Sequence, residues 1–248
     1  MKPLLVLKCG GAVASQAVEP VHALRAEGYV VLVVHGAGPQ ISAEMERRGL
    51  PVEFVGGRRV TTPEALDVVR ESLVKVNAAL CAAIGSLAAG FMGDEIGLTA
   101  ARIDKLGLVG DPTPCRPAPI LDALGQGRIP IVAPLAKGPL NVNADEAAAA
   151  LAVGLGADRL LFVSDVPGVL VEGDVLPSIG VDEADTLLGN GTFEGGIVPK
   201  LRAAVQAARL GVQADIGETA VLSAENAARF PRRGSSAVAS LGSETRGS

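Results

Sequence analysis

Two stretches of this 248-residue chain decide its fold: Leu4-Leu-Val-Leu-Lys-Cys-Gly-Gly11 and Tyr29-Val-Val-Leu-Val-Val-His-Gly-Ala-Gly38. Each begins with a short apolar run, rich in Leu or in β-branched Val, and ends in clustered glycines. Short continuous apolar runs are typical of strands covered on both faces, as in a parallel sheet. We therefore expect two buried parallel strands, each followed by a glycine-rich turn.

The same rhythm continues along the chain. Further buried strands are expected at residues 129–133 and 160–163, and helices at 15–27, 39–48, 63–80, 144–155 and 199–210. Strands that alternate with helices are typical of α/β folds with helices on both faces of a parallel sheet. Residues 51–60 and 98–118 lack a clear period and are expected to form hairpins. No linker stands out, so we expect one domain over residues 1–248.

The composition excludes several classes of protein. Acidic residues outnumber basic ones 27 to 22, which argues against a nucleic-acid or membrane-surface partner, because both require a basic face. No apolar run reaches the roughly 18 residues of a membrane span, and the first run is too short for a signal peptide. The three cysteines form no Cys-x-x-Cys pair, and the two histidines fit no metal-ligand pattern. The sequence predicts a cytoplasmic protein without a metal site.

The two glycine-rich turns admit two interpretations. Ligands bind at the carboxyl ends of parallel strands, where glycines let backbone N–H groups approach a phosphate closely. The alternative is that both are ordinary turns between a strand and a helix. Lys8, at the end of the first strand, favours an anion site. The usual nucleotide motifs, GxxxxGK[ST] and GxGxxG after a strand, are missing, so any phosphate site here has a different form.

Two charged residues of the second half also admit two interpretations. Asp145 stands at the start of an expected helix, where an acid often serves as a cap or a first-turn residue. Lys200 stands in the first turn of another helix, where a cation opposes the helix dipole. Lys200 is therefore not placed for helix stability, which favours a functional role.

Six segments, in order along the chain, resemble the motif series of the amino-acid kinase family, and within it the kinases of N-acetylglutamate. They are Lys8-Cys-Gly-Gly11, His35-Gly-Ala-Gly-Pro-Gln40, Gly56-Gly-Arg-Arg-Val-Thr61, Asn141-Val-Asn-Ala-Asp145, Ser164-Asp-Val-Pro-Gly168 and Gly195-Gly-Ile-Val-Pro-Lys200. Any single motif is weak, but six in order at suitable spacing are specific. The resemblance runs from residue 3 to about residue 236.

The resemblance implies a three-layer α/β/α sandwich around a mainly parallel open sheet. Residues of about 1–140 would bind N-acetyl-L-glutamate and carry the dimer contacts, and residues of about 141–240 would bind ATP with Mg²⁺. The implied reaction phosphorylates the side-chain carboxylate of acetylglutamate in arginine or ornithine biosynthesis. A carboxylate with a pKa near 4.3 is already ionised at pH 7, so this chemistry needs no general base. It needs positive charge and positioning, since phosphoryl transfer depends chiefly on these.

The resemblance also implies roles for individual residues. Lys8 and Lys200 would stabilise the transferring phosphoryl group, and Asp145 would hold both lysines in place. The substrate would be bound by Gly36, Ala37, Gly38, Arg59 and Asn141. The nucleotide would be bound by Gly10, Gly11, Asp165, Val166, Pro167, Gly168, Val169, Leu170, Thr192, Phe193, Glu194, Gly195 and Gly196.

The chain departs from the family pattern at two informative positions. Ala37 stands where the family usually has the middle glycine of its turn, so we expect a backbone without positive φ there, because a left-handed residue with a Cβ costs about 1–2 kcal/mol. Arg58 stands beside Arg59 where an apolar residue is common. If Arg58 held the substrate instead, the alignment of this segment would shift by one residue. His35 is expected to be a hydrogen-bonded structural residue rather than a catalyst.

Alternative functions and the assembly follow from the same residues. A kinase of carrier-bound aminoadipate or glutamate would keep the fold and both lysines. A non-catalytic nucleotide or amino-acid sensor would not need both lysines. Because the first strand begins at Leu4, with no helix before it, the resemblance implies a homodimer that free arginine does not inhibit. The long helix over residues 63–80 is the expected interface.

Overall fold

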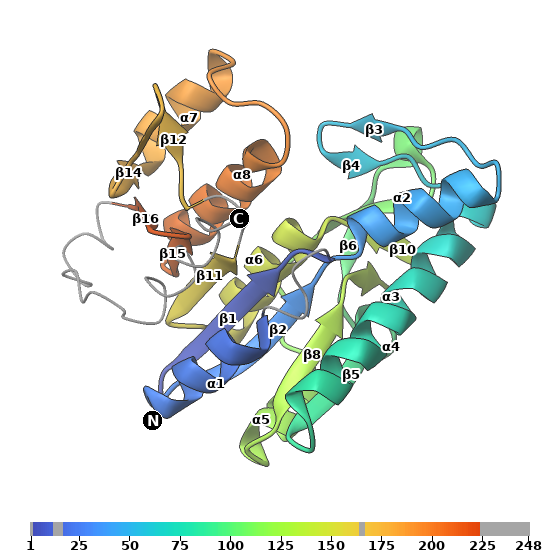
Figure 1. Cartoon of the computed structure of the whole chain (residues 1–248), viewed down its shortest axis with the longest axis horizontal. Coiled ribbons are helices and arrows are strands. Elements are labelled where there is room, and N and C mark those ends of the chain that lie inside the picture. Colours follow the sequence, from blue (N-terminus) through green and yellow to red (C-terminus); the bar gives the residue numbers. More distant parts are fainter. Residues whose placement is uncertain (1, 12–16, 164–166, 224–248) are drawn as a thin grey trace, which may run out of the picture.

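The computed structural model describes residues 2–11, 17–163 and 167–223, and an eight-stranded sheet forms its centre (Figure 1). The strand order is β14 (Ser178–Gly180), β16 (Thr219–Leu222), β15 (Gln213–Ile216), β11 (Arg159–Val163), β1 (Leu4–Cys9), β2 (Val30–His35), β8 (Ile129–Ala133) and β5 (Ala88–Met92). All neighbouring pairs are parallel except β15 and β16. The expected mainly parallel open sheet is confirmed.

Helices cover both faces of the sheet, because side chains alternate between the faces along each strand. Leu5 and Leu7 pack with α1 (Val18–Ala26) and α3 (Pro63–Ile84). Val6 points to the opposite face and packs with α6 (Ala144–Leu155) and α8 (Ile197–Arg209). The three-layer α/β/α sandwich is therefore confirmed. The other α-helices of the described residues are α2 (Gly38–Arg47), α4 (Gly93–Ile96), α5 (Ala118–Gly125) and α7 (Val181–Gly189).

Three smaller sheets surround the ends of the central strands. The four-stranded one has the order β6 (Ala100–Arg102), β7 (Val109–Pro112), β10 (Leu140–Val142) and β9 (Leu135–Ala136). The two hairpins are β3 (Phe54–Val55) with β4 (Arg58–Arg59), and β12 (Leu170–Val171) with β13 (Asp174–Val175). The antiparallel pairs β3–β4 and β6–β7 confirm the hairpins expected over residues 51–60 and 98–118.

The helix boundaries follow local signals. The expected helix 144–155 matches α6 at both ends, and Thr62 caps α3 by accepting a hydrogen bond from the Ala65 N–H. The expected end of α3 at residue 80 was wrong. The helix continues through an alanine-rich segment to Ile84 and ends at Gly85, whose φ of 88° suits only glycine well. The described part of the expected helix 15–27 begins at Val18.

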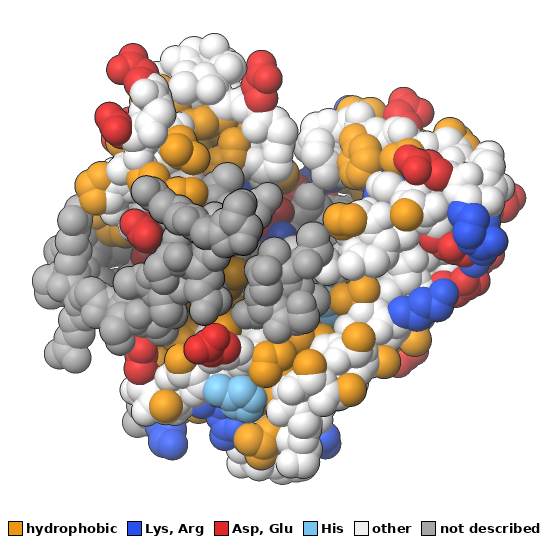
Figure 2. Space-filling model, viewed as in Figure 1, with side chains coloured by type: hydrophobic (Ala, Val, Ile, Leu, Met, Phe, Trp, Pro, Cys, Tyr) orange, Lys and Arg blue, Asp and Glu red, His pale blue; other side chains and the backbone are white. Residues whose placement is uncertain are grey.

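The two halves of the chain occupy different halves of the sheet. Strands β1, β2, β8 and β5 come from the first 140 residues, and β11, β15, β16 and β14 come from the remainder. The halves meet at the parallel pair β1–β11. Figure 2 shows α7 and the β3–β4 hairpin on two separate prominences, with charged side chains in the hollow between them. Within the described residues, no helix combines the length and the apolarity needed to cross a bilayer.

Candidate active site

Three elements bring Lys8, Asp145 and Lys200 together. Lys8 lies two residues after Val6 on β1, so its side chain points to the sheet face covered by α6 and α8. Asp145 is the second residue of α6, and Lys200 ends the first turn of α8. The amino ends of both helices lie at the carboxyl end of β1, as parallel α/β connections require. The three predicted catalytic residues form one cluster.

The Asp145 carboxylate is shared between the two lysines. Its Oδ1 atom lies 2.8 Å from the Lys8 Nζ and 3.3 Å from the Lys200 Nζ. All three side chains are buried. Burial alone would raise the pKa of Asp145, but the charges of Lys8 and Lys200 outweigh it and hold that pKa below its usual value. Asp145 is thus a carboxylate at neutral pH and not a poised base.

The cluster carries one positive charge in excess, since two ammonium groups share one carboxylate. Burial, and after it the charge of Lys8, lowers the pKa of Lys200, while Asp145 opposes the shift. The Lys200 Nζ also lies 5.8 Å from the centroid of the Phe162 ring, within the range of a cation–π contact. A buried cluster with excess positive charge gains free energy from a bound anion.

Asn143 caps α6 and thereby sets the position of Asp145. Its side-chain oxygen accepts hydrogen bonds from the backbone N–H groups of Asp145, at 2.8 Å, and of Glu146, at 3.3 Å. Its amide nitrogen donates to the carbonyl of Gly57, in the turn between β3 and β4, at 3.2 Å. Because Asn143 is the cap, the Asp145 side chain is free to bind the lysines.

The two glycine-rich turns lie against each other. The Gly36 N–H donates to the Cys9 carbonyl at 2.9 Å, and the Gln40 side chain donates to the Gly11 carbonyl at 2.9 Å. A Cβ at position 11 would lie 2.7 Å from the Cα of Ala37, so only glycine fits there. Ala37 has a φ of −146°, which confirms the expected absence of a left-handed conformation.

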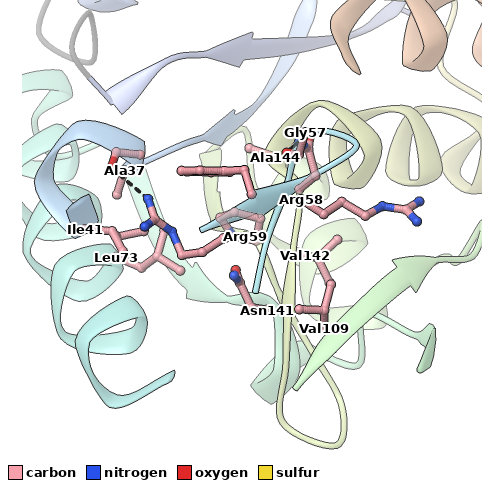
Figure 3. Close-up of a pocket in the computed structure, with 14 residues that line it drawn as sticks. Ala37, Ile41, Gly57, Arg58, Arg59, Leu73, Val109, Asn141, Val142 and Ala144 are labelled. Atoms are coloured by element: carbon pink, nitrogen blue, oxygen red, sulfur yellow. Dashed lines mark hydrogen bonds between the residues drawn. The ribbon is translucent and has the colours of Figure 1, made fainter. Parts of the chain in front are cut away.

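A cavity of about 110 Å³ is lined by the start of α2, the β3–β4 hairpin and the start of α6 (Figure 3). Four of the five predicted substrate-binding residues line it: Ala37, Gly38, Arg59 and Asn141. Gly36 is not among the lining residues, although it holds the turn in place. The cavity reaches Ala144, the residue before Asp145.

Arg59 is a buried cation without a carboxylate partner among the described residues. Its guanidinium donates to the Ser42 hydroxyl at 2.8 Å and to the Gly38 carbonyl at 3.2 Å, and its Cζ lies 4.5 Å from the centroid of the Phe54 ring. Burial lowers the pKa of Arg59 from its ordinary value. A desolvated guanidinium at a cavity wall is suited to bind a carboxylate through two parallel hydrogen bonds.

Arg58 points the other way, as expected for neighbouring residues on a strand (Figure 3). Its guanidinium pairs with Glu146 at 2.9 Å and with Asp111 at 2.7 Å. These partners already neutralise Arg58, so Arg59 is the better candidate for a substrate carboxylate. Asn141, the other polar candidate, donates from its amide to the Thr61 hydroxyl at 3.0 Å.

None of the described residues predicted for the nucleotide lines this cavity. Asp165 and Val166 lie outside the described residues. Pro167, Gly168, Val169 and Leu170 lead into β12, but the Val169 side chain is buried in the core and its N–H donates to the Thr219 hydroxyl at 2.8 Å.

The other nucleotide segment precedes α8 and its Lys200. Phe193 is packed into the core, whereas Thr192, Glu194, Gly195 and Gly196 are exposed. Gly195 has a φ of 66°, a conformation in which glycine carries no steric penalty. Gly10 and Gly11 follow β1 and lie next to the lysine cluster through Lys8.

Sequence reasoning missed three residues of the site. Phe54 covers the Arg59 guanidinium, Ser42 holds it from α2, and Asn143 caps α6. Asn143 had a local signal, because Asn two residues before an acid at a helix start is a typical cap. Phe54 also had one, because a hairpin turn at Gly56-Gly57 places it directly opposite Arg59. Ser42 had none, since its distance in sequence from Arg59 follows no local pattern.

Comparison with known proteins agrees with this geometry. The chain is 46% identical over 215 residues to an acetylglutamate kinase of a Nocardioides species, which covers 78% of this chain and 68% of that protein. It is 40% identical over 230 residues to the acetylglutamate kinase of Roseiflexus castenholzii, with 86% and 88% covered. The crystal structure of smu.665 from Streptococcus mutans superposes with a TM-score of 0.79 at 31% identity, over 90% of this chain and 99% of that one.

The family assignment rests on a match to a family model. Residues 3–217 match the model of the amino acid kinase family, which is well over half of the chain and includes Lys8, Asp145 and Lys200. The α/β/α architecture and the buried lysine cluster agree with it. The chain therefore belongs to the amino acid kinase family.

Proposed function

We propose that this protein transfers the γ-phosphoryl group of ATP to the side-chain carboxylate of N-acetyl-L-glutamate, forming an acyl phosphate, as a step of arginine biosynthesis. The observation that carries the proposal is the buried Lys8–Asp145–Lys200 cluster, with one positive charge in excess, beside a cavity walled by Arg59. The kinship to acetylglutamate kinases supports the substrate.

The proposed mechanism uses charge and position. The substrate carboxylate attacks as an anion, so no proton is removed, and the phosphorus–oxygen bond to ADP breaks as the new bond forms. Lys8 and Lys200 stabilise the charge of the transferring phosphoryl group from two sides. Asp145 keeps both ammonium groups in place and reduces their mutual repulsion. The glycine-rich turns offer backbone N–H groups, and Arg59 binds a carboxylate of the substrate that does not react.

ATP would be bound by the C-terminal half, along residues 165–170 and 192–196. Among the described residues, no group of three His, Cys, Asp or Glu side chains is arranged to hold a metal ion. Mg²⁺ would therefore arrive on the phosphates of ATP, where it neutralises negative charge, which is its usual binding mode in kinases. The chain's own part is to supply the lysines.

The assembly and location belong to the same proposal. We place the enzyme in the cytoplasm as a homodimer. The three cysteines are unpaired, which suits a reducing compartment. The exposed side of α3 carries Val74 and several alanines, and a second copy of this chain would cover it.

The proposal is tested by trapping the product. Purified protein with ATP, Mg²⁺ and N-acetyl-L-glutamate should give an acyl phosphate that hydroxylamine converts to a coloured hydroxamate. Omission of any one component should abolish the colour. Parallel reactions with N-acetylaspartate, and with glutamate or aminoadipate linked to a carrier protein, test specificity. Turnover of a carrier-linked substrate, without turnover of free acetylglutamate, would contradict the proposal.

A further inference from the structure

His35 is a buried polar residue that the proposed mechanism does not use. It ends β2, immediately before the turn formed by Gly36, Ala37 and Gly38, and its side chain has no exposed surface. Val33, two residues earlier, packs with α3, so the His35 ring points toward that helix. A buried imidazole requires hydrogen-bond partners for both of its nitrogens.

Both partners are present, and they determine which nitrogen carries the proton. The Nδ1 atom lies 3.2 Å from the carbonyl oxygen of Gly36, which can only accept, so Nδ1 must donate. The Nε2 atom lies 3.1 Å from the amide nitrogen of Asn77 on α3 and accepts from it. Burial lowers the pKa of His35 to about 4, so the ring is neutral at pH 7.

Asn77 is itself held in one orientation. Its amide nitrogen also donates to the Ile131 carbonyl at 2.9 Å, which assigns the nitrogen and the oxygen of the side chain. Its oxygen accepts from the Cys81 thiol at 3.6 Å. Gly90 on β5 leaves the space for this amide, because a Cβ there would collide with the Asn77 oxygen. This series of hydrogen bonds, from Ile131 through Asn77 and His35 to Gly36, therefore links the core to the glycine turn.

The Gly36 end of this series of hydrogen bonds lies at the cavity. A trans peptide directs its carbonyl and its N–H in opposite directions. Because the Gly36 carbonyl points toward His35, the Ala37 N–H of the same peptide points away from His35. Ala37 and Gly38 line the cavity, and their N–H groups have no acceptor among the described residues. An N–H fixed in this way is ready to bind an anion without reorganisation.

We propose that His35 is a positioning residue: its neutral, Nδ1-protonated ring, held by Asn77, fixes the Gly36–Ala37 peptide so that the Ala37 N–H faces the acetylglutamate or the transferring phosphoryl group. This proposal rests on the proposed function. It assigns no proton transfer to His35 and no contact with substrate.

The first test reads the tautomer directly. The chain has two histidines, and His22 on α1 is exposed, so the spectrum has only two rings to assign. Two-bond ¹H–¹⁵N correlation spectra at pH 7 of the wild type and of His22→Asn should show His35 as the Nδ1–H tautomer. An Nε2–H tautomer, or a ring that is protonated at pH 7, would overturn the proposal. This test does not depend on activity.

The second test uses two substitutions that each keep half of the ring's contacts. An Asn amide occupies the place of Nδ1 and can still donate to Gly36, whereas a Gln amide reaches the place of Nε2 and cannot. Since one preorganised donor is worth roughly 10²–10³ in rate, kcat of His35→Gln should lie at least about tenfold below that of His35→Asn, with smaller changes in both KM values. His22→Asn is the matched control.

The outcomes separate the two proposals. If the wild type forms no acyl phosphate from acetylglutamate, the proposed function fails, while the tautomer test still decides the hydrogen-bond chain. If the wild type is active and the two His35 variants have equal kcat values, the positioning role is wrong. Thermal unfolding of both variants shows how much of any common loss arises from the missing ring.

Discussion

At the residue scale, the site depends on one carboxylate that serves two cations. Asp145 offers a single oxygen to Lys8 and Lys200, so each lysine keeps part of its charge for a ligand. A second acid in the cluster would neutralise the excess charge and weaken anion binding. The adjacent Glu146 does not do so, because it binds Arg58.

The lysines should act in the transition state more than in substrate binding. We expect Lys8→Ala and Lys200→Ala each to lower kcat by roughly 10²–10³, with smaller increases in either KM, because charge moves onto the transferring group only during reaction. Steady-state kinetics with both substrates varied measures this, and Lys105→Ala, at an exposed lysine, is the control. Retention of more than about a third of wild-type kcat by either variant would contradict its role.

Substitutions of the two neighbouring arginines should differ in their effect on the KM for acetylglutamate. We expect Arg59→Lys to raise the KM for acetylglutamate at least tenfold (about 1.4 kcal/mol), with an almost unchanged KM for ATP, because lysine keeps the charge but loses the planar fork. Arg58→Lys should change both constants less, because the charge of Arg58 is already paired with Glu146 and Asp111. An effect seen only in Arg58→Lys would show that the segment is misaligned by one residue.

At the scale of elements, the N-terminal caps of the helices determine where the site residues lie. The cap of α6 positions Asp145 and also holds the β3–β4 turn through Gly57, so one side chain connects the lysine cluster with the hairpin that carries Arg59. The cap of α3, at Thr62, has only a helix to stabilise. The two caps therefore form a natural pair for comparison.

Removal of each cap should cost similar stability but unequal activity. We expect Asn143→Ala and Thr62→Ala each to lower the free energy of unfolding by about 1 kcal/mol, since each loses a cap. Only Asn143→Ala should also lower kcat/KM for acetylglutamate, by about tenfold or more, because Asp145 and the hairpin both lose their anchor. Urea unfolding and steady-state kinetics measure the two effects. Equal losses of activity would show that the cap acts through stability alone.

At the scale of the whole molecule, the sheet joins the halves and α3 offers a surface for assembly. We expect light scattering to give about 50 kDa, twice the 25.0 kDa chain, because a two-fold pair is the commonest soluble assembly. Ala78→Arg, on the exposed side of α3, should give about 25 kDa, while Ala26→Arg on α1 should not. A monomeric wild type, or an Ala78→Arg variant that stays dimeric, would contradict the proposed interface.

Much of the architecture could be predicted because its signals are local. About ten residues of local sequence are enough to predict several elements. Examples are the Val-rich run of β2, the Thr and Pro at the start of α3, and the alanine-rich α6. The strands that escaped prediction, such as Ala88–Met92 and Gln213–Ile216, are short and contain Ala, Gly or polar residues. They become strands because neighbouring strands supply their hydrogen bonds, β8 for the first and β11 with β16 for the second, and no local pattern records that.

The sequence by itself determined the central strands β1, β2, β8 and β11, the helices α1, α2, α3, α6 and α8, the glycine turns at the ends of β1 and β2, and the candidate charges Lys8, Asp145 and Lys200. Only the tertiary structure decided how these charges are partnered: that Asp145 lies between the lysines, that Arg58 is neutralised while Arg59 is not, and that His35 meets Asn77. The reason is physical. Backbone preference acts over a few neighbouring residues, whereas the burial and pairing of a charge depend on residues distant in the chain that folding brings within a few ångströms.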